Sequence, residues 1–216
     1  MNVQNNVKTM RQDIAKRAAD ELGEGEVINL GVGIPTLIPE YLGDKHVFLH
    51  SENGLLGTGP APEDGQINPD LINASKQPVT ELPGSAIFDS ALSFAMIRGG
   101  HVDTAVIGAL QVDQTGELAN WAVPGKDILG VGGAMDLVAG VQKVILTMTH
   151  TSKSGEAKIV ESLTYPSSGY RKADVLITEK AVFTFKDNQM YLVELADGVT
   201  VEDIEETTAA SFVVAL

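Results

Sequence analysis

Four short apolar runs constrain the fold of this chain more than any other feature. They are residues 27–30, 104–108, 144–148 and 174–178. None of them shows the strict polar–apolar alternation of a strand with one wet face. Continuous apolar runs of this length are typical of strands buried on both faces of a parallel sheet.

Helical patterns lie between these runs. In the clearest, Met10, Ile14, Ala18 and Leu22 recur every four residues, and Gly23 ends the helix. Further helices are expected at residues 34–42, 90–97 and 200–209 and after Gly133. The alternation of strands and helices predicts an α/β fold: a three-layer sandwich, with a mostly parallel sheet, helices on both faces and a carboxyl-terminal hairpin over residues 181–195. The 216 residues, 44% of them apolar, suit one domain spanning residues 1–216.

One carboxylate stands where a strand gives way to a glycine-rich loop. Residues 47–50 form a short apolar run, and Glu52 follows it directly. This places Glu52 just past the carboxyl end of a strand, where open α/β sheets bind ligands. Gly54 and the next two glycines allow the backbone to approach a ligand. A carboxylate there can act as a nucleophile or a base, although a solvated surface residue or a helix cap is the ordinary alternative.

Two other glycine clusters could contribute to a site. Gly31 and Gly33 follow the run 27–30, but Thr36 stands where the dinucleotide-binding fingerprint needs a third glycine or an alanine, so this fingerprint is not met. Gly132 and Gly133 precede a short apolar helix, where backbone N–H groups can hold an oxyanion. The spacing alone favours a simple tight turn at that position.

Charge and composition exclude several classes of function. A formal net charge of −14 without clustered Lys or Arg argues against nucleic acid. The chain has no cysteine, and its four histidines lack metal-ligand spacing, so we expect no metal; His50 is interpreted as structural. Nowhere do about 18 uncharged apolar residues run together, as a membrane-spanning helix would need, and no apolar stretch of signal-peptide length follows the polar amino terminus. A cytoplasmic protein without membrane contact is expected.

The motifs resemble one enzyme family. Residues 51–60, Ser-Glu-Asn-Gly-Leu-Leu-Gly-Thr-Gly-Pro, are similar to the catalytic segment of the family I coenzyme A transferases, in their beta subunit or the second half of the fused enzymes. The similarity extends to Asn-Leu-Gly-Val-Gly-Ile-Pro-Thr at 29–36, to Gly-Ala-Leu-Gln-Val-Asp at 108–113, to Asn-Trp at 120–121 and to Gly-Gly-Ala-Met-Asp-Leu-Val at 132–138. It covers residues 8–215.

The resemblance implies a fold, a chemistry and a site. The fold is that of the CoA transferases, which is shared with sugar-phosphate isomerases. Glu52 would be the nucleophile that carries CoA as a glutamyl thioester, with the amide of Gly133 in the oxyanion hole and Gly132 as the neighbouring alternative. Substrate and CoA contacts would come from Asn53, Gly54, Gly31, Gly33 and Gly132.

The resemblance also implies partners and substrates. The chain would join an alpha subunit in an α2β2 heterotetramer, which suits a chain with few basic clusters to hold CoA phosphates. Lys153 and Lys158 are candidates for such contacts, although solvated lysines are the ordinary interpretation. The substrates would be a carboxylic acid and acetoacetyl-, succinyl-, butyryl- or acetyl-CoA, with CoA as co-substrate and no cofactor. Two other functions stay open: a non-catalytic ligand-binding domain of similar fold, and an acyl-CoA hydrolase using the same glutamate.

Overall fold

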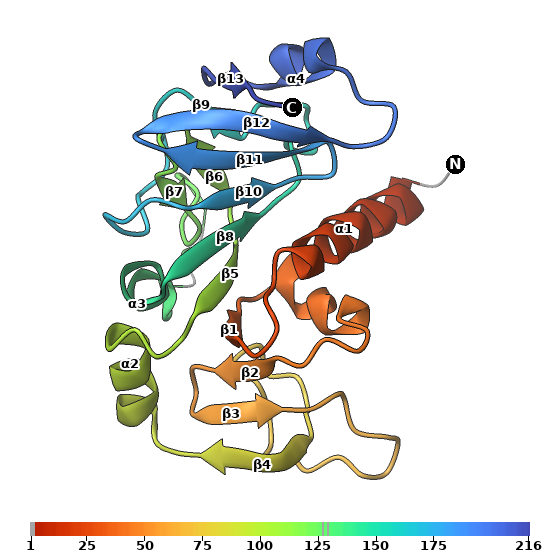
Figure 1. Cartoon of the computed structure of the whole chain (residues 1–216), viewed down its shortest axis with the longest axis vertical. Coiled ribbons are helices and arrows are strands. Elements are labelled where there is room, and N and C mark those ends of the chain that lie inside the picture. The colour runs from red at the N-terminus through yellow and green to blue at the C-terminus, as the bar shows by residue number, and fades with distance from the viewer. Residues whose placement is uncertain (1–2, 127, 129) are drawn as a thin grey trace.

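A ten-stranded sheet forms the middle of the molecule (Figure 1). The computed structural model describes residues 3–126, 128 and 130–216. The strands lie in the order β13-β12-β11-β10-β8-β5-β1-β2-β3-β4. In that order they are Val213–Val214, Gln189–Leu195, Ala181–Lys186, Val175–Ile177, Lys143–Thr147, Thr104–Gly108, Val27–Leu30, Phe48–Ser51, Leu55–Thr58 and Glu81–Ile87.

The centre of this sheet is parallel, antiparallel hairpins flank it on both sides, and the short edge strand β13 pairs in parallel with β12. Strands β2, β1, β5, β8 and β10 pair in parallel. The four apolar runs of the sequence are therefore neighbouring central strands, as predicted. Hairpins extend both ends: β3 and β4 beyond β2, and β11 and β12 beyond β10. The mostly parallel α/β sheet is confirmed.

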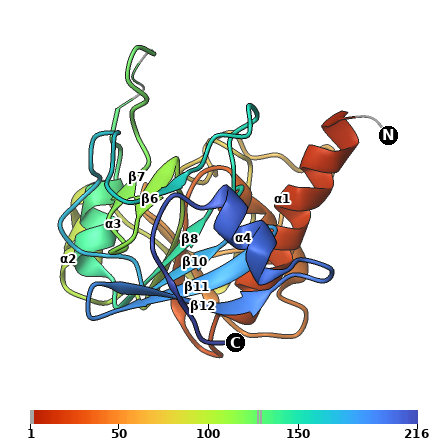
Figure 2. The ribbon, with the colours of Figure 1, turned by 90° about the horizontal axis from the view of Figure 1, so that it is seen from above.

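Helices cover both faces of the sheet (Figure 2). The long helix α1 (Val3–Asp20) and the 3-10 helix η1 (Ile34–Tyr41) pack on one face. The other face carries α2 (Ser90–Arg98), α3 (Ala134–Gly140) and a small three-stranded sheet. Those three strands are β6 (Gln111–Asp113), β7 (Leu118–Ala119) and β9 (Ile159–Val160). Helix α4 (Val201–Thr207) lies near the carboxyl terminus.

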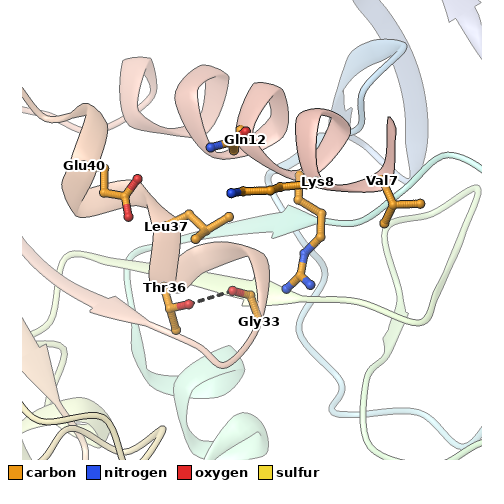
Figure 3. Close-up of a pocket in the computed structure, with 8 residues that line it drawn as sticks. Val7, Lys8, Gln12, Gly33, Thr36, Leu37 and Glu40 are labelled. Atoms are coloured by element: carbon orange, nitrogen blue, oxygen red, sulfur yellow. Dashed lines mark hydrogen bonds between the residues drawn. The ribbon is translucent and has the colours of Figure 1, made fainter. Parts of the chain in front are cut away.

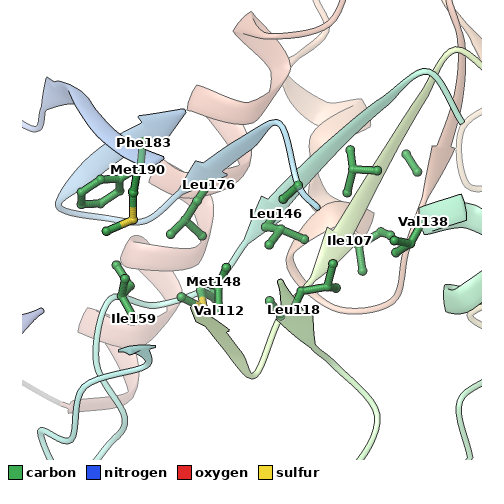
Figure 4. Close-up of a cluster of buried hydrophobic side chains, with 14 of the residues drawn as sticks. Ile107, Val112, Leu118, Val138, Leu146, Met148, Ile159, Leu176, Phe183 and Met190 are labelled. Atoms are coloured by element: carbon green, nitrogen blue, oxygen red, sulfur yellow. The ribbon is translucent and has the colours of Figure 1, made fainter. Parts of the chain in front are cut away.

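The central strands divide their side chains between two apolar cores. On β8, Val144 and Leu146 point to the core that includes α3 and the small sheet, whereas Ile145 points to the core under α1. Figure 4 shows the first core, in which Leu146, Leu176 and Phe183 pack against residues of the small sheet. Burial on both faces explains why these strands are apolar at successive positions.

Several elements differ from the sequence-based expectation. The helix expected at 34–42 is a 3-10 helix, and Pro39 inside it has no N–H to donate to an α-helical turn. Strands β3 and β4 were not predicted: β3 is the glycine-rich stretch after Glu52, and β4 has Pro83 and Gly84 within it. In the small sheet, β6 and β7 form an antiparallel hairpin, and β9 pairs with β6 in parallel.

Candidate active site

A cavity of about 330 Å³ opens at the carboxyl ends of three neighbouring central strands. Gly31 follows β1, Glu52 follows β2, and Gly108 ends β5. The far wall comes from the segment before α3 and from the turn after β7. The cavity is lined by Gly31, Val32, Glu52, Ile107, Gly108, Asn120, Trp121, Gly130, Val131, Gly132, Gly133, Ala134 and Leu137. This position, where β1 has β5 on one side and β2 on the other, is where open α/β sheets bind ligands.

Glu52 is the only carboxylate among the described residues that line this cavity. Its side chain is half-buried at the end of β2. Glu52 Oε2 accepts a hydrogen bond of 3.1 Å from Asn29 Nδ2. Within the described part of the chain, Oε1 accepts no hydrogen bond. One carboxylate oxygen is thus held, while the other is available to a ligand.

Gly54 shapes the turn that presents Glu52. Its N–H donates to Ser51 O at 2.9 Å, and its own carbonyl accepts from Phe88 N at 3.0 Å. The φ of +118° lies in the region that favours glycine, and a Cβ at this position would stand 2.0 Å from Phe88 O. Only glycine fits here, because any side chain would force the turn away from the end of β4.

Gly133 lies beside the Glu52 side chain. It is the N-cap residue of α3, and a Cβ on it would stand 3.5 Å from Glu52 Cγ. Neither Gly132 N–H nor Gly133 N–H donates a hydrogen bond to another residue of the described ranges. Helix α3 is tied to α2 by a 2.7 Å bond from Arg98 Nε to Asp136 Oδ1. Two amide groups that donate to none of the described residues therefore belong to the lining of the same cavity as Glu52.

Buried polar side chains support Glu52 from behind. Asn29 on β1 is directly opposite His50 on β2 in the parallel ladder. Asn29 Nδ2 lies 3.1 Å from His50 Nδ1, and His50 Nε2 lies 3.0 Å from Ser93 Oγ on α2. Burial lowers the pKa of His50 from 6.5 to about 4. The ring is therefore neutral at neutral pH.

The structure brings together some of the predicted site residues and separates others. Gly31, Glu52, Gly132 and Gly133 line one cavity. Asn53 does not line it: its side-chain amide donates to Ile72 O at 2.8 Å. Gly54 acts on the turn rather than on the cavity wall.

Gly33 lies in a different cavity, of about 450 Å³, between α1 and η1 (Figure 3). It shares that cavity with Lys8 and Arg11 of α1, and its carbonyl accepts from Thr36 Oγ1 at 2.8 Å. The loop of residues 31–33 thus lies between two cavities, with Gly31 at the first and Gly33 at the second.

Sequence reasoning missed Asn29 as a partner of Glu52. Its signal was a lone amide within the apolar run 27–30, where an unpaired polar group would be unfavourable. His50, interpreted as structural, is indeed buried and hydrogen-bonded, but its partner Asn29 links it to the site. Lys158 donates to Thr149 O at 3.1 Å, and neither Lys158 nor the exposed Lys153 lines the Glu52 cavity.

A metal-binding cluster and a helix that could span a membrane are two further features to consider in the described residues. Among residues 3–126, 128 and 130–216, no cluster of three or more His, Asp or Glu could hold a metal ion. In the same part of the chain, no helix combines the length and apolar character needed to cross a membrane.

Comparisons with known proteins agree with the geometry. The family model described as coenzyme A transferase matches residues 11–207. One subunit of the probable succinyl-CoA:3-ketoacid coenzyme A transferase of Bacillus subtilis (strain 168) is 48% identical over 209 residues, which cover 96% of this chain and 97% of that protein. The beta subunit of the acetate CoA-transferase of Escherichia coli (strain K12) is 50% identical over 206 residues, which cover 95% of this chain and 94% of that protein.

A solved structure has the same fold. The acyl-CoA transferase apoenzyme from Escherichia coli O157:H7 superposes with a TM-score of 0.77 at 28% identity. The match covers 95% of this chain but only 42% of that one. This chain therefore corresponds to less than half of the solved polypeptide.

Proposed function

The chain belongs to the coenzyme A transferase family, and on that premise we propose that Glu52 is its nucleophile. The observation that carries this proposal is the placement of Glu52 in a cavity at the carboxyl ends of the central strands, which Gly132 and Gly133 also line. Among the described residues, one oxygen of Glu52 and the amides of both glycines have no hydrogen-bond partner. A positioned carboxylate is an established kind of nucleophile in covalent catalysis.

The reaction runs in two halves through the Glu52 carboxyl group. Glu52 Oε1 attacks the thioester carbonyl of the acyl-CoA, the C–S bond breaks, and an acyl-glutamyl anhydride and the CoA thiolate result. The thiolate then attacks Glu52 Cδ, which releases the donor acid and leaves a glutamyl-CoA thioester. An incoming carboxylate takes CoA by the reverse sequence. The thioester energy is conserved throughout, so this route needs neither ATP nor a metal.

Each attack passes through a tetrahedral oxyanion, which preorganised N–H groups stabilise. The amide of Gly133 is assigned to the oxyanion on the acyl group, with Gly132 as its neighbour, because both glycines line the cavity of Glu52 and neither amide donates to a described residue. Water must be kept from the anhydride, since hydrolysis would waste the thioester. The apolar lining residues Val32, Ile107 and Leu137 suit that requirement.

The partner is proposed to be an alpha subunit. The relatives from Bacillus subtilis and Escherichia coli are each named as one subunit of an enzyme, the second of them as the beta subunit, which implies a companion for those proteins. The solved acyl-CoA transferase chain is more than twice as long as the part matched here. We propose an α2β2 heterotetramer in which the alpha subunit supplies most contacts to the CoA phosphates. The substrates are a short-chain acyl-CoA and a free acid, of the succinyl, acetoacetyl, acetyl or butyryl type, and a cytoplasmic location stays a prediction.

The experiment that tests this function traps the covalent intermediate. The chain, assembled with its alpha subunit, is mixed with acetoacetyl-CoA alone, reduced with borohydride and analysed by peptide mass spectrometry. We expect a reduced residue at Glu52 in the wild-type enzyme and none in Glu52→Ala. Glu161→Gln, which removes an exposed carboxylate away from the cavity, is the matched control and should be trapped like wild type.

Two outcomes would point elsewhere. Free CoA released in the absence of any acceptor acid, at the rate of turnover, would favour an acyl-CoA hydrolase. An unmodified Glu52 in a correctly assembled complex would reject the nucleophile assignment and favour a ligand-binding domain.

A further inference from the structure

Three buried side chains form a continuous polar chain that ends on the Glu52 carboxylate. Ser93 on α2 contacts His50 on β2, His50 contacts Asn29 on β1, and Asn29 contacts Glu52. The heavy-atom distances are 3.0, 3.1 and 3.1 Å. Asn29 and Ser93 are 0% exposed and His50 is 3% exposed. Polar groups this deeply buried are unfavourable unless their partners are fixed.

The donors and acceptors of this chain settle which atom carries the ring proton. Asn29 Nδ2 can only donate, so His50 Nδ1 must accept from it. The proton of the neutral ring is then on Nε2, which donates to Ser93 Oγ. The lowered pKa of His50 is consistent with a ring that stays neutral. His50 thereby fixes the side-chain amide of Asn29 with its NH₂ group toward Glu52.

The orientation of the Asn29 amide is maintained although its own oxygen has no partner among the described residues. Asn29 Oδ1 is buried without any hydrogen bond to the described residues. The NH₂ group, in contrast, lies within reach of three acceptors: His50 Nδ1, His50 O at 3.3 Å and Glu52 Oε2. An amide rotated by half a turn would place Oδ1 against the carboxylate, where two acceptors repel. The structure thus favours a donor, rather than an acceptor, at Glu52 Oε2.

We propose that the Asn29 amide is the oxyanion donor for the second attack of the proposed reaction, and that His50 is its positioning residue. This inference rests on the proposed role of Glu52. In that step the sulfur lone pair of the CoA thiolate forms the S–Cδ bond, and the π electrons of the Cδ=Oε2 bond move onto Oε2. Collapse restores Cδ=Oε2, breaks the Cδ–Oε1 bond and releases the donor acid as its carboxylate. The negative charge of the intermediate lies on the atom that Asn29 Nδ2 contacts.

This arrangement gives the two tetrahedral intermediates separate donors. The first oxyanion forms on the acyl oxygen of the substrate, where the Gly133 amide is assigned. The second forms on Glu52 itself, and its donor must therefore stand behind the nucleophile rather than across the cavity. Asn29 is the described side chain that donates to Glu52.

The test measures the ratio of hydrolysis to transfer in Asn29→Ala and in Asn29→Asp, which keeps the size of the side chain and removes the donor. Slowing the second attack lengthens the life of the anhydride, so water intercepts more of it. Transfer should fall about 100-fold, as for loss of one oxyanion donor, and the ratio of free CoA released to CoA transferred should rise. His50→Ala should raise the same ratio, and His50→Gln, whose side-chain oxygen can accept from Asn29, should restore it in part.

The matched control is Gln111→Ala. Gln111 is a buried amide on β6 that is bonded to Thr164 and does not line the cavity, so its loss should lower stability and leave the ratio unchanged. A structural role for Asn29 would likewise reduce the amount of active enzyme without changing the ratio. An unchanged ratio in folded, assembled Asn29→Ala or Asn29→Asp enzyme would overturn the inference. The proposed function is judged separately, by whether wild-type enzyme is trapped at Glu52.

Discussion

At the scale of single residues, the proposed reaction depends on the length of the Glu52 side chain. Withdrawing the carboxylate by one methylene in Glu52→Asp moves it away from the thioester carbon, and misplacement of about 1 Å can cost about 100-fold in rate. We expect a loss of at least that size in kcat, with an unchanged unfolding midpoint, measured by steady-state kinetics on the assembled enzyme and by urea denaturation. Glu52→Asp turnover within about threefold of wild type would contradict the assignment.

Gly133 leaves little space beside the nucleophile. Its φ of −84° is open to alanine, but the new Cβ would meet the Phe94 ring at 3.1 Å and Glu52 Cγ at 3.5 Å. Gly133→Ala should therefore fold normally and lose about tenfold or more in kcat through displacement of Glu52. Gly132→Ala is the useful comparison, because it has open space but a φ of +56°, and should lower stability first. Comparing kcat and urea midpoints of the two variants checks this.

His50 makes the free energy of unfolding depend on pH in the acidic range. Burial lowers its pKa from 6.5 to about 4, so between these values the unfolded chain binds a proton that the folded protein does not. The stabilisation is full above pH 6.5 and is lost as the pH falls toward 4. One such histidine contributes about 3 kcal/mol to the fall. The pKa of His150 is lowered to about 4 as well, chiefly by burial and then by Lys180 and Lys158.

We therefore expect the free energy of unfolding to fall steeply between about pH 6.5 and 4.5, and to fall less in His50→Gln. Urea denaturation at a series of pH values measures both slopes. Equal slopes in wild type and His50→Gln would mean that His50 is not held neutral by the fold.

At the scale of elements, the turn between β2 and β3 is held by contact with the end of β4. Gly54→Ala would place a Cβ 2.0 Å from Phe88 O, so the backbone of one strand must move. We expect a loss of about 2–4 kcal/mol in unfolding free energy. Gly43→Ala serves as control, since its φ is also positive, at +57°, but its Cβ would meet nothing within 4 Å. The control should lose only about 1 kcal/mol, the ordinary cost of the conformation.

The elements that the sequence predicted well are those whose pattern is set by local chemistry. Central strands buried on both faces must be apolar throughout, and the hairpin of β11 and β12 has Asp187 and Asn188 with positive φ at its turn. Strand β3 escaped prediction because its glycine-rich sequence is typical of a loop, although three of its four residues are buried. Strand β4 escaped prediction because it is the edge strand of the sheet, with Pro83 and Gly84 within it. β4 is exposed along most of its length, so no apolar pattern marks it.

The candidate site also contains residues that the sequence identified and residues that it did not. Glu52 could be located from its glycine-rich motif and Gly133 from the family resemblance, and the structure places them side by side. The link from Asn29 to Glu52 could not, because it depends on the register that puts Asn29 opposite His50 in neighbouring strands. Gly31 and Gly33 shared one motif, yet the tight loop turns them toward different cavities.

At the scale of the whole molecule, the net charge of −14 bears on the partner. CoA carries several phosphate charges, and a strongly acidic chain repels such a ligand unless another polypeptide supplies cations. We expect the purified chain alone to bind CoA weakly and to show no transfer. Addition of the alpha subunit should restore both, with a mass in light scattering that corresponds to two copies of each chain. Sustained transfer by the isolated chain would overturn this expectation.

The position of the cavity also bears on how such a protein can change over generations. Glu52, Gly132 and Gly133 stand in loops at the strand ends, outside the two apolar cores that hold the layers together. A mutation of Glu52 or Gly133 can alter the reaction with little penalty to folding, whereas Asn29 lies within a central strand, where sheet packing and the reaction both constrain it. Among proteins that share this fold, we expect substitutions to occur first at the loop residues of the site and last at Asn29 in β1.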